Sequence, residues 1–276
     1  MKISRDKKNA NKKNTNKKNY SAVIIMTVLI VYMMLPLLVS FVYSVFEKWT
    51  EIIPVGFSLR HYVELIQDPE FLYCILRTIV ICIFPIGITV ILVLLSLFVA
   101  TVYFPRLEKY IQIICMIPYT IQGVILSVSI LSLYVGAKSF LSNRLIMLFG
   151  AYCIIILPYI YPGIRNGMRA VNIHVLLEAA QMLGTSKIYA FFKIIVPNIL
   201  SSIVVSCLLA VGIIFGDYVL VRNLAGTSFS NLQIYLYQTM KSDSGKASAV
   251  FVVIMFITFI ITAAVLYMNS RQKDKK

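Results

Sequence analysis

The chain has 276 residues, of which 59% are hydrophobic and only 13% are charged, with a formal net charge of +15. So few charged residues cannot coat a soluble domain of this length, and a mean hydropathy of +0.85 is typical of polytopic membrane proteins. The length leaves room for one membrane domain and excludes a sizeable soluble domain beside it.

The two ends of the chain are basic. Residues 1–20 are rich in Lys and Asn and have no apolar periodicity, which predicts a disordered tail. We interpret it as a cytoplasmic tail that sets orientation and touches anionic lipid, with no nucleic-acid partner. The apolar run that follows is too long for a signal-peptide core. Residues 269–276 form a second basic cytoplasmic tail, and residues 21–268 form the membrane domain.

Six long apolar runs lie between the tails. Crossing the hydrocarbon core takes about 20 helical residues, so the runs predict an all-α, polytopic membrane protein with six transmembrane helices. The first four contain proline, which helix bundles tolerate within membranes, and the fourth run is marginal in length. The runs cover residues 21–46, 78–103, 111–135, 145–161, 199–221 and 247–267.

The distribution of Lys and Arg predicts the orientation of these helices. If the N-terminus is inside, the inner segments hold most of the 26 Lys and Arg residues, including both tails. Positively charged loops stay in the cytoplasm. The sequence therefore predicts six spans with both termini cytoplasmic, and it places the loop of residues 172–197 in the cytoplasm as well.

This loop has the pattern of two short amphipathic helices. Asn172 is expected to cap the first helix, and Gly184 to end it in the left-handed conformation. Ser186 is expected to cap the second, and Pro197 to stop it or to turn the chain into the next span. The expected apolar faces are Ile173, Leu176, Leu177, Ala180 and Leu183, and then Ile188, Phe191, Phe192 and Ile195.

The loop also contains a motif. Glu178-Ala179-Ala180, then Gly184 after three residues, then Val196-Pro197 after a further stretch resembles the EAA loop of type I ABC importer permeases, the membrane components of binding-protein-dependent uptake systems. Val196 is a departure, because the family usually has Leu there.

This resemblance implies that Glu178, Ala179, Ala180 and Gly184 couple the permease to ABC ATPase subunits, with the glycine elbow and the preceding helix in a groove of the ATPase. It also implies a second permease subunit, identical or homologous, and an extracytoplasmic substrate-binding protein. The expected location is the bacterial inner membrane.

The catalytic motifs that would make the chain an enzyme are absent. There is no P-loop, so a separate ATPase is expected to hydrolyse ATP. The five cysteines have apolar neighbours and show no metal-ligand spacing. The two histidines, His61 and His174, lie far apart in the sequence. We therefore expect no cofactor and no metal site.

Asp217 is the ionisable residue that lies clearly within an apolar run. Such residues are costly in membranes and often functional. Asp217 either lies near the outer gate or permeation path, or is a helix-end residue bonded to nearby backbone. One acid gives little support to the alternative function, an ion-coupled secondary transporter, and a non-transporting scaffold is a third possibility.

The segment around Asp217 also bears on the substrate. Gly216-Asp217-Tyr218-Val219 and residues 232–238 resemble the permeases of the polyamine, phosphonate, thiamine and ferric-iron group. The resemblance therefore implies a small solute. The first outer loop, residues 47–71, carries several acids and is either a face for the binding protein or a solvated connector.

Overall fold

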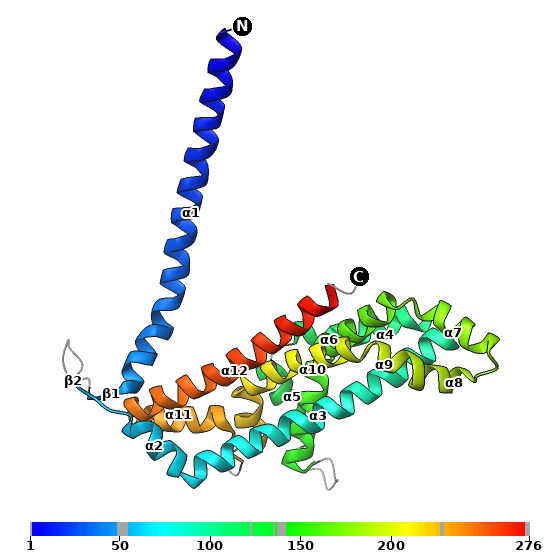
Figure 1. Ribbon diagram of the computed structural model, residues 1–276. Helices are drawn as coiled ribbons and strands as arrows, with labels where there is room; N and C mark the ends of the chain where they lie inside the picture. The colour runs from blue at the N-terminus through cyan, green and yellow to red at the C-terminus, as the bar shows by residue number, and fades with distance from the viewer. Residues whose placement is uncertain are drawn as a thin grey trace.

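The computed structural model describes residues 2–48, 55–121, 123–134, 136, 142–226 and 229–273. Residue 1, residues 274–276 of the predicted tails and residues 49–54 of the first outer loop lie outside them. Within the described part the chain is helical except for one short hairpin (Figure 1). The elements are α1 (Lys2–Val45), β1 (Phe46–Lys48), β2 (Val55–Phe57), α2 (Arg60–Gln67), α3 (Pro69–Val102), α4 (Leu107–Met116), η1 (Ile117–Thr120), α5 (Gly123–Tyr134), α6 (Arg144–Ala170), α7 (Ile173–Met182), α8 (Lys187–Ala190), η3 (Phe191–Ile195), α9 (Val196–Asn198), α10 (Leu200–Phe215), η4 (Val221–Ala225), α11 (Leu232–Ser242) and α12 (Ser244–Lys273).

Helix α1 packs on α12 at its C-terminal end and projects from the bundle as a long arm over the rest of its length (Figure 1). Its apolar part, Val23–Val45, is long enough to cross a membrane, and its side chains are exposed from Val23 through Leu35. The helix already begins at Lys2, which differs from the expectation of a disordered tail over residues 1–20. Once an apolar segment has nucleated a helix, extending it costs little, and lysine is a good helix former.

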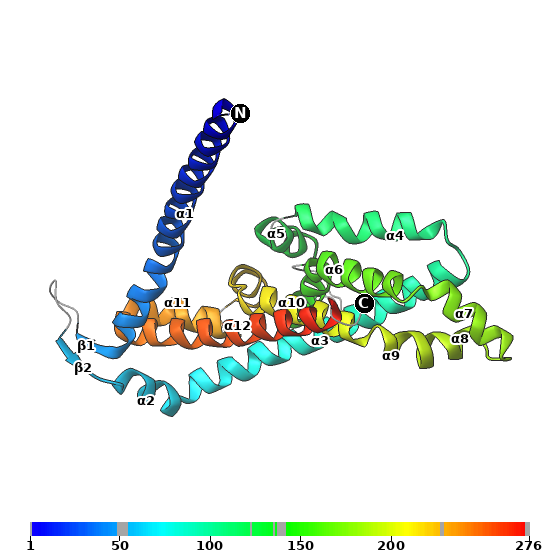
Figure 2. The same ribbon diagram turned by 45° about the horizontal axis from the view of Figure 1, so that its top comes forward.

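The core lies where α3, α6, α10 and α12 run alongside one another (Figure 2). Large side chains are fully buried in this space, among them Tyr152 and Tyr161 of α6. Of the five cysteines, all free, three are buried and two half-buried, as expected of small apolar residues. The buried ones are Cys74, Cys82 and Cys115.

Helices α6 and α10 approach each other most closely at two glycines. A Cβ added to Gly163 would lie 1.8 Å from Ser206 Oγ, and one added to Gly167 would lie 2.6 Å from Ser202 Cβ. Small residues four apart on both helices allow the backbones to pack at this distance. The two helices that flank residues 172–197 are therefore in direct contact.

Four of the expected spans are single long helices, and two are broken. The first, second, fourth and sixth runs correspond to α1, α3, α6 and α12. The third is Leu107–Thr120 plus Gly123–Tyr134, bent by 101°. The fifth run forms α10, which meets the preceding loop segment Lys187–Asn198 at 66° and ends at Phe215, before the non-helical residues 217–218. The described residues thus hold four single helices long and apolar enough to cross a membrane, or up to six spans if each bent pair is one span, as an all-α, polytopic membrane protein requires. The fourth span is longer than its run, because α6 extends at both ends into polar sequence.

The end of the bundle that carries α2 and α11 is held by Asp68, which precedes α3. Its Oδ2 accepts hydrogen bonds from Tyr235 Oη at 2.6 Å and from Lys246 Nζ at 2.9 Å. Burial raises the pKa of Asp68, but these bonds and the backbone N–H of Glu70 outweigh it and lower the pKa to about 2. One ionised carboxylate thus joins α3, α11 and α12.

Candidate functional site

Helix α7 follows α6 after only two residues and projects from the opposite end of the bundle, which we call the loop end (Figure 1). Ile173, Leu177 and Ala180 are buried against the rest of the chain, and Leu176 is partly buried. This face was expected from the helical spacing. Asn172, however, makes no side-chain capping bond and takes a left-handed conformation with φ 53°, so it acts as a turn residue between α6 and α7.

The C-terminal end of α7 forms a complete glycine-based cap. Gly184 has φ +80°, its N–H donates to Gln181 O at 2.9 Å, and the Thr185 N–H donates to Ala180 O at 3.1 Å. These two bonds define a Schellman motif, which needs a left-handed residue at the glycine position. The prediction that Gly184 ends the helix in this conformation is confirmed.

Two apolar side chains stand out from the surface at this turn. Met182 is 90% exposed and Leu183 is 85% exposed, directly before Gly184. Leu183 was expected to continue the buried face, but the helix ends at Met182 and the turn rotates Leu183 outward. Sequence reasoning missed this pair; their place beside an expected helix-ending glycine was the available signal. They are the most exposed of the large apolar side chains among the described residues, which makes them a candidate contact surface.

The second helical segment anchors the turn in the bundle. The Ser186 side chain caps α8 by accepting from the Tyr189 N–H, as expected. The helix continues through the π-helical turn η3 into α9, passes Pro197 and ends at Asn198. Phe191 is fully buried, with its ring 4.8 Å from that of Phe98 in α3. The expected apolar face of this second helix is only partly buried, because Ile188 and Phe192 are exposed.

The four predicted coupling residues lie on two sides of α7. Glu178, Ala179 and Gly184 are exposed, whereas Ala180 is 4% exposed and packs against the chain itself. Small Ala180 thus allows α7 to lie close to its own bundle. The outward surface that remains consists of Glu178, Ala179, Gly184 and the two apolar side chains before it. This surface is anchored to the bundle by the buried face of α7 and by the second helical segment, and its tip is apolar. It is therefore suited to contact another protein.

Asp217 lies outside this surface, in the break between α10 and the short helix that contains η4. Its Oδ2 accepts from Tyr152 Oη at 2.9 Å and from the Leu220 N–H at 3.1 Å. Its backbone oxygen accepts from Asn231 Nδ2 at 3.0 Å. The carboxylate thus caps a helix start and holds α6, which is one of the two arrangements that the sequence left open. The fifth apolar run was expected to be helical through this position.

The model of the family described as "Binding-protein-dependent transport system inner membrane component" matches residues 92–273. Putative 2-aminoethylphosphonate transport system permease proteins PhnV are 19% identical to this chain over 251 residues. The match covers 87% of the chain and 91% of each relative, one from Salmonella typhi and one from Salmonella typhimurium.

Two solved structures have a similar fold. One is a bacterial ABC transporter involved in the import of the acidic polysaccharide alginate, with a TM-score of 0.66 and 16% identity over 92% of this chain and 94% of that chain. The other is the bacterial alginate ABC transporter in complex with an alginate pentasaccharide-bound periplasmic protein, with a TM-score of 0.63 and 17% identity over 90% and 92%. Both likenesses concern the fold.

Proposed function

Because the chain belongs to the family of binding-protein-dependent transport system inner membrane components, it is a permease subunit of an ABC importer, and we propose that residues 172–197 are its coupling loop, the surface that binds an ATPase subunit. The observation that carries this proposal is the exposed tip at Met182 and Leu183 above a fixed glycine turn. Glu178, Ala179 and Gly184 complete the contact, and Ala180 holds α7 to the bundle.

The anchoring of the loop supports a mechanical role. Phe191 and Ile195 are fully buried, and α6 and α10, which flank the loop, touch through Gly163 and Gly167. A push or pull on the tip is therefore passed to whole helices. Closure of an ATPase dimer on ATP would rock the spans between inward-facing and outward-facing states as rigid bodies. Membership in this family decides against the ion-coupled alternative.

The proposal also gives the complex its orientation and its partners. The loop end faces the cytoplasm, and so do both termini, since the basic segments collect on that side. The end with α2 and α11 then faces a substrate-binding protein delivering the solute. A second permease subunit, identical or homologous, completes the path. In the relative with the alginate-bound periplasmic protein, such a delivery complex was solved.

For the substrate we favour a small solute of the phosphonate type. The curated relatives that match most of the chain are putative 2-aminoethylphosphonate permeases, and the segment around Asp217 resembles the group of permeases that includes them. Polyamine, thiamine and ferric-iron substrates belong to the same group and are the competitors that an uptake assay should include.

Gly184→Val tests the coupling loop. A β-branched residue is strained at φ +80°, while a Cβ there meets nothing within 4 Å, so the bundle itself suffers no clash. We expect near-normal membrane levels, loss of copurification with the ATPase in mild detergent, and loss of uptake.

Gly150→Val is the matched control. Gly150 is an exposed helical glycine whose added Cβ also meets nothing within 4 Å, so uptake and copurification should stay near wild type. Normal uptake and a normally retained ATPase in Gly184→Val would show that the elbow is not the coupling contact.

A further inference from the structure

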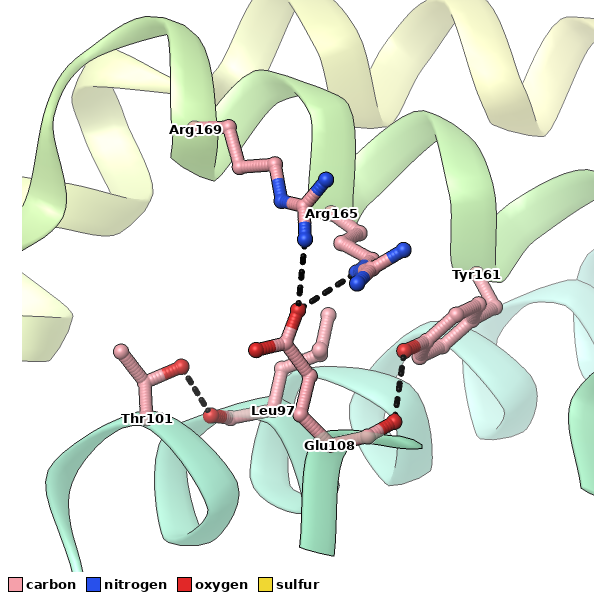
Figure 3. Close-up of polar contacts among 6 residues, drawn as sticks. All are labelled: Leu97, Thr101, Glu108, Tyr161, Arg165 and Arg169. Atoms are coloured by element: carbon pink, nitrogen blue, oxygen red, sulfur yellow. Dashed lines mark hydrogen bonds and ion pairs between the residues drawn. The ribbon is translucent and has the colours of Figure 1, made fainter. Parts of the chain in front are cut away.

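A second polar cluster lies near the loop end, between α4 and α6 (Figure 3). Oε1 of Glu108 accepts a hydrogen bond from Arg165 Nε at 2.6 Å and another from Arg169 Nη2 at 3.3 Å. The Tyr161 hydroxyl donates to the backbone oxygen of Glu108 at 3.4 Å. One residue of α4 thus contacts three residues of α6 that lie on successive turns.

The cluster is partly shielded from water. The side chain of Arg165 is 17% exposed and that of Glu108 is 32% exposed, while Arg169 reaches further into solvent at 61%. Charges also match the helix ends, because Glu108 lies in the first turn of α4 and Arg169 in the last turn of α6. Acids favour helix N-termini and bases favour C-termini. Of the two ion pairs, Glu108–Arg165 is the shorter and the less exposed to water.

Apolar packing does little to hold α4 in place. Within α4, all of whose residues are described, Cys115 alone is buried, whereas Tyr110, Ile113 and Ile114 are each more than half exposed. The position of this helix on the bundle therefore depends strongly on its polar contact with α6. That contact is made at the end where the third, broken span begins.

Arg165 and Arg169 also occupy a special place on α6. They lie in its last two turns, directly before the two-residue connection to α7. A displacement of the coupling loop therefore reaches α6 through these last two turns. Glu108 takes the displacement from there to α4, which continues through η1 into α5.

We propose that Glu108 is a positioning residue that makes the third span move together with α6 when the ATPase displaces the coupling loop. This inference rests on the proposed coupling function of residues 172–197. The Glu108–Arg165 ion pair stays formed through the transport cycle and keeps α4 at a fixed position on α6. Without it, α6 still follows the ATPase, but α4 and α5 lag behind, and ATP hydrolysis no longer opens the path fully.

The first test uses Glu108→Gln and the charge-swapped variant Glu108→Arg/Arg165→Glu. Glu108→Gln removes the ionic attraction, and the swap restores it, with Arg169 one turn from the new acid on α6. Lys109→Gln, the loss of an exposed charge on the next residue of α4, is the control. Uptake, ATP hydrolysis and copurification of the ATPase are measured for each in the assembled transporter.

We expect Glu108→Gln to retain the ATPase and to hydrolyse ATP, with uptake per ATP reduced roughly tenfold, within the range of mutations along coupling elements. The swap should recover most of this loss, and Lys109→Gln should lose none. Unchanged uptake per ATP in Glu108→Gln, or a loss that the swap does not repair, would overturn the proposal. Failure of the coupling-loop proposal is recognised separately, by normal uptake and a normally retained ATPase in Gly184→Val.

A distance measurement gives a readout that a purely structural role would not change. Spin labels are placed at exposed Gln112 on α4 and exposed His174 on α7, in a chain whose own cysteines are replaced by alanine. In the otherwise wild-type complex the distance should be equal without nucleotide and with trapped ATP. In Glu108→Gln it should change between the two states. A distance that changes equally with and without Glu108 would show that this residue does not hold α4 to α6.

Discussion

At the scale of single residues, Asp217 shows how much an apolar sequence leaves undecided. Its place after Gly216 allowed a role in the path or a role in capping. In the structure its Oδ2 receives two hydrogen bonds, from Tyr152 and from the Leu220 N–H. An asparagine oxygen accepts the same two bonds, whereas a longer glutamate side chain must move both partners.

We therefore expect Asp217→Asn to keep uptake within about twofold of wild type, and Asp217→Glu to transport less. Asp217→Ala should lower stability by about 1–3 kcal/mol, because it leaves the buried Tyr152 hydroxyl without this acceptor. Uptake of 2-aminoethylphosphonate, with a polyamine as competitor, and thermal unfolding in detergent are the measurements. The reverse order, with Asn much worse than Glu, would assign Asp217 to the path of a cationic solute.

The same scale separates what residue types reveal from what they conceal. Gly184 and Ser186 were predicted correctly, because a helix-ending glycine and a capping serine act through local backbone geometry. Asn172 was assigned the wrong local role, since its turn is set by how α6 and α7 pack. Glu108 was not singled out at all, because its partners are more than fifty positions away in the sequence.

At the scale of elements, the contact between α6 and α10 joins the two helices on either side of the coupling loop. Gly167 lies against Ser202, where an added Cβ would come within 2.6 Å of the serine Cβ and Oγ. A contact this close tolerates no extra methyl group without a shift of one helix.

Gly167→Ala should therefore destabilise the chain by about 1–3 kcal/mol, the usual cost of overpacking. Adding Ser202→Gly removes the atoms that the new methyl group meets and should restore most of the loss. Thermal unfolding in detergent measures both variants, with Gly150→Ala as the control in open space. Equal stability of Gly167→Ala and wild type would show that the two helices are free to move apart.

Hydropathy located the elements well but not their bends. Four apolar runs become α1, α3, α6 and α12, whereas the third is bent near residue 121 and the helix of the fifth ends at Phe215, before the expected end at residue 221. Apolar composition indicates that a segment is buried or lies in the membrane, but it does not indicate where the chain bends. Helix α11 and the β1–β2 hairpin were also missed, since short, mixed segments carry little periodic signal.

At the scale of the whole molecule, the proposed orientation places both termini on the side of the coupling loop. A fluorescent protein that matures only in the cytoplasm should be bright when fused to either end, and alkaline phosphatase, which is active only outside, should be inactive there. Fusion of the phosphatase after α2 should give activity. An active phosphatase at the C-terminus would reverse the orientation.

The isolation of α1 determines which substitutions the chain can accept over evolutionary time. From Val23 through Leu35 the side chains of α1 are exposed and do not pack among those of the chain. Packing within the chain therefore does not restrict their shape, and this segment needs only to be apolar and long enough to cross the membrane. Shape is required in α6, where Tyr152 and Ile156 are fully enclosed. The exposed part of the first span can therefore accept any substitution that keeps it apolar, whereas the enclosed positions of α6 also require a side chain of the right shape.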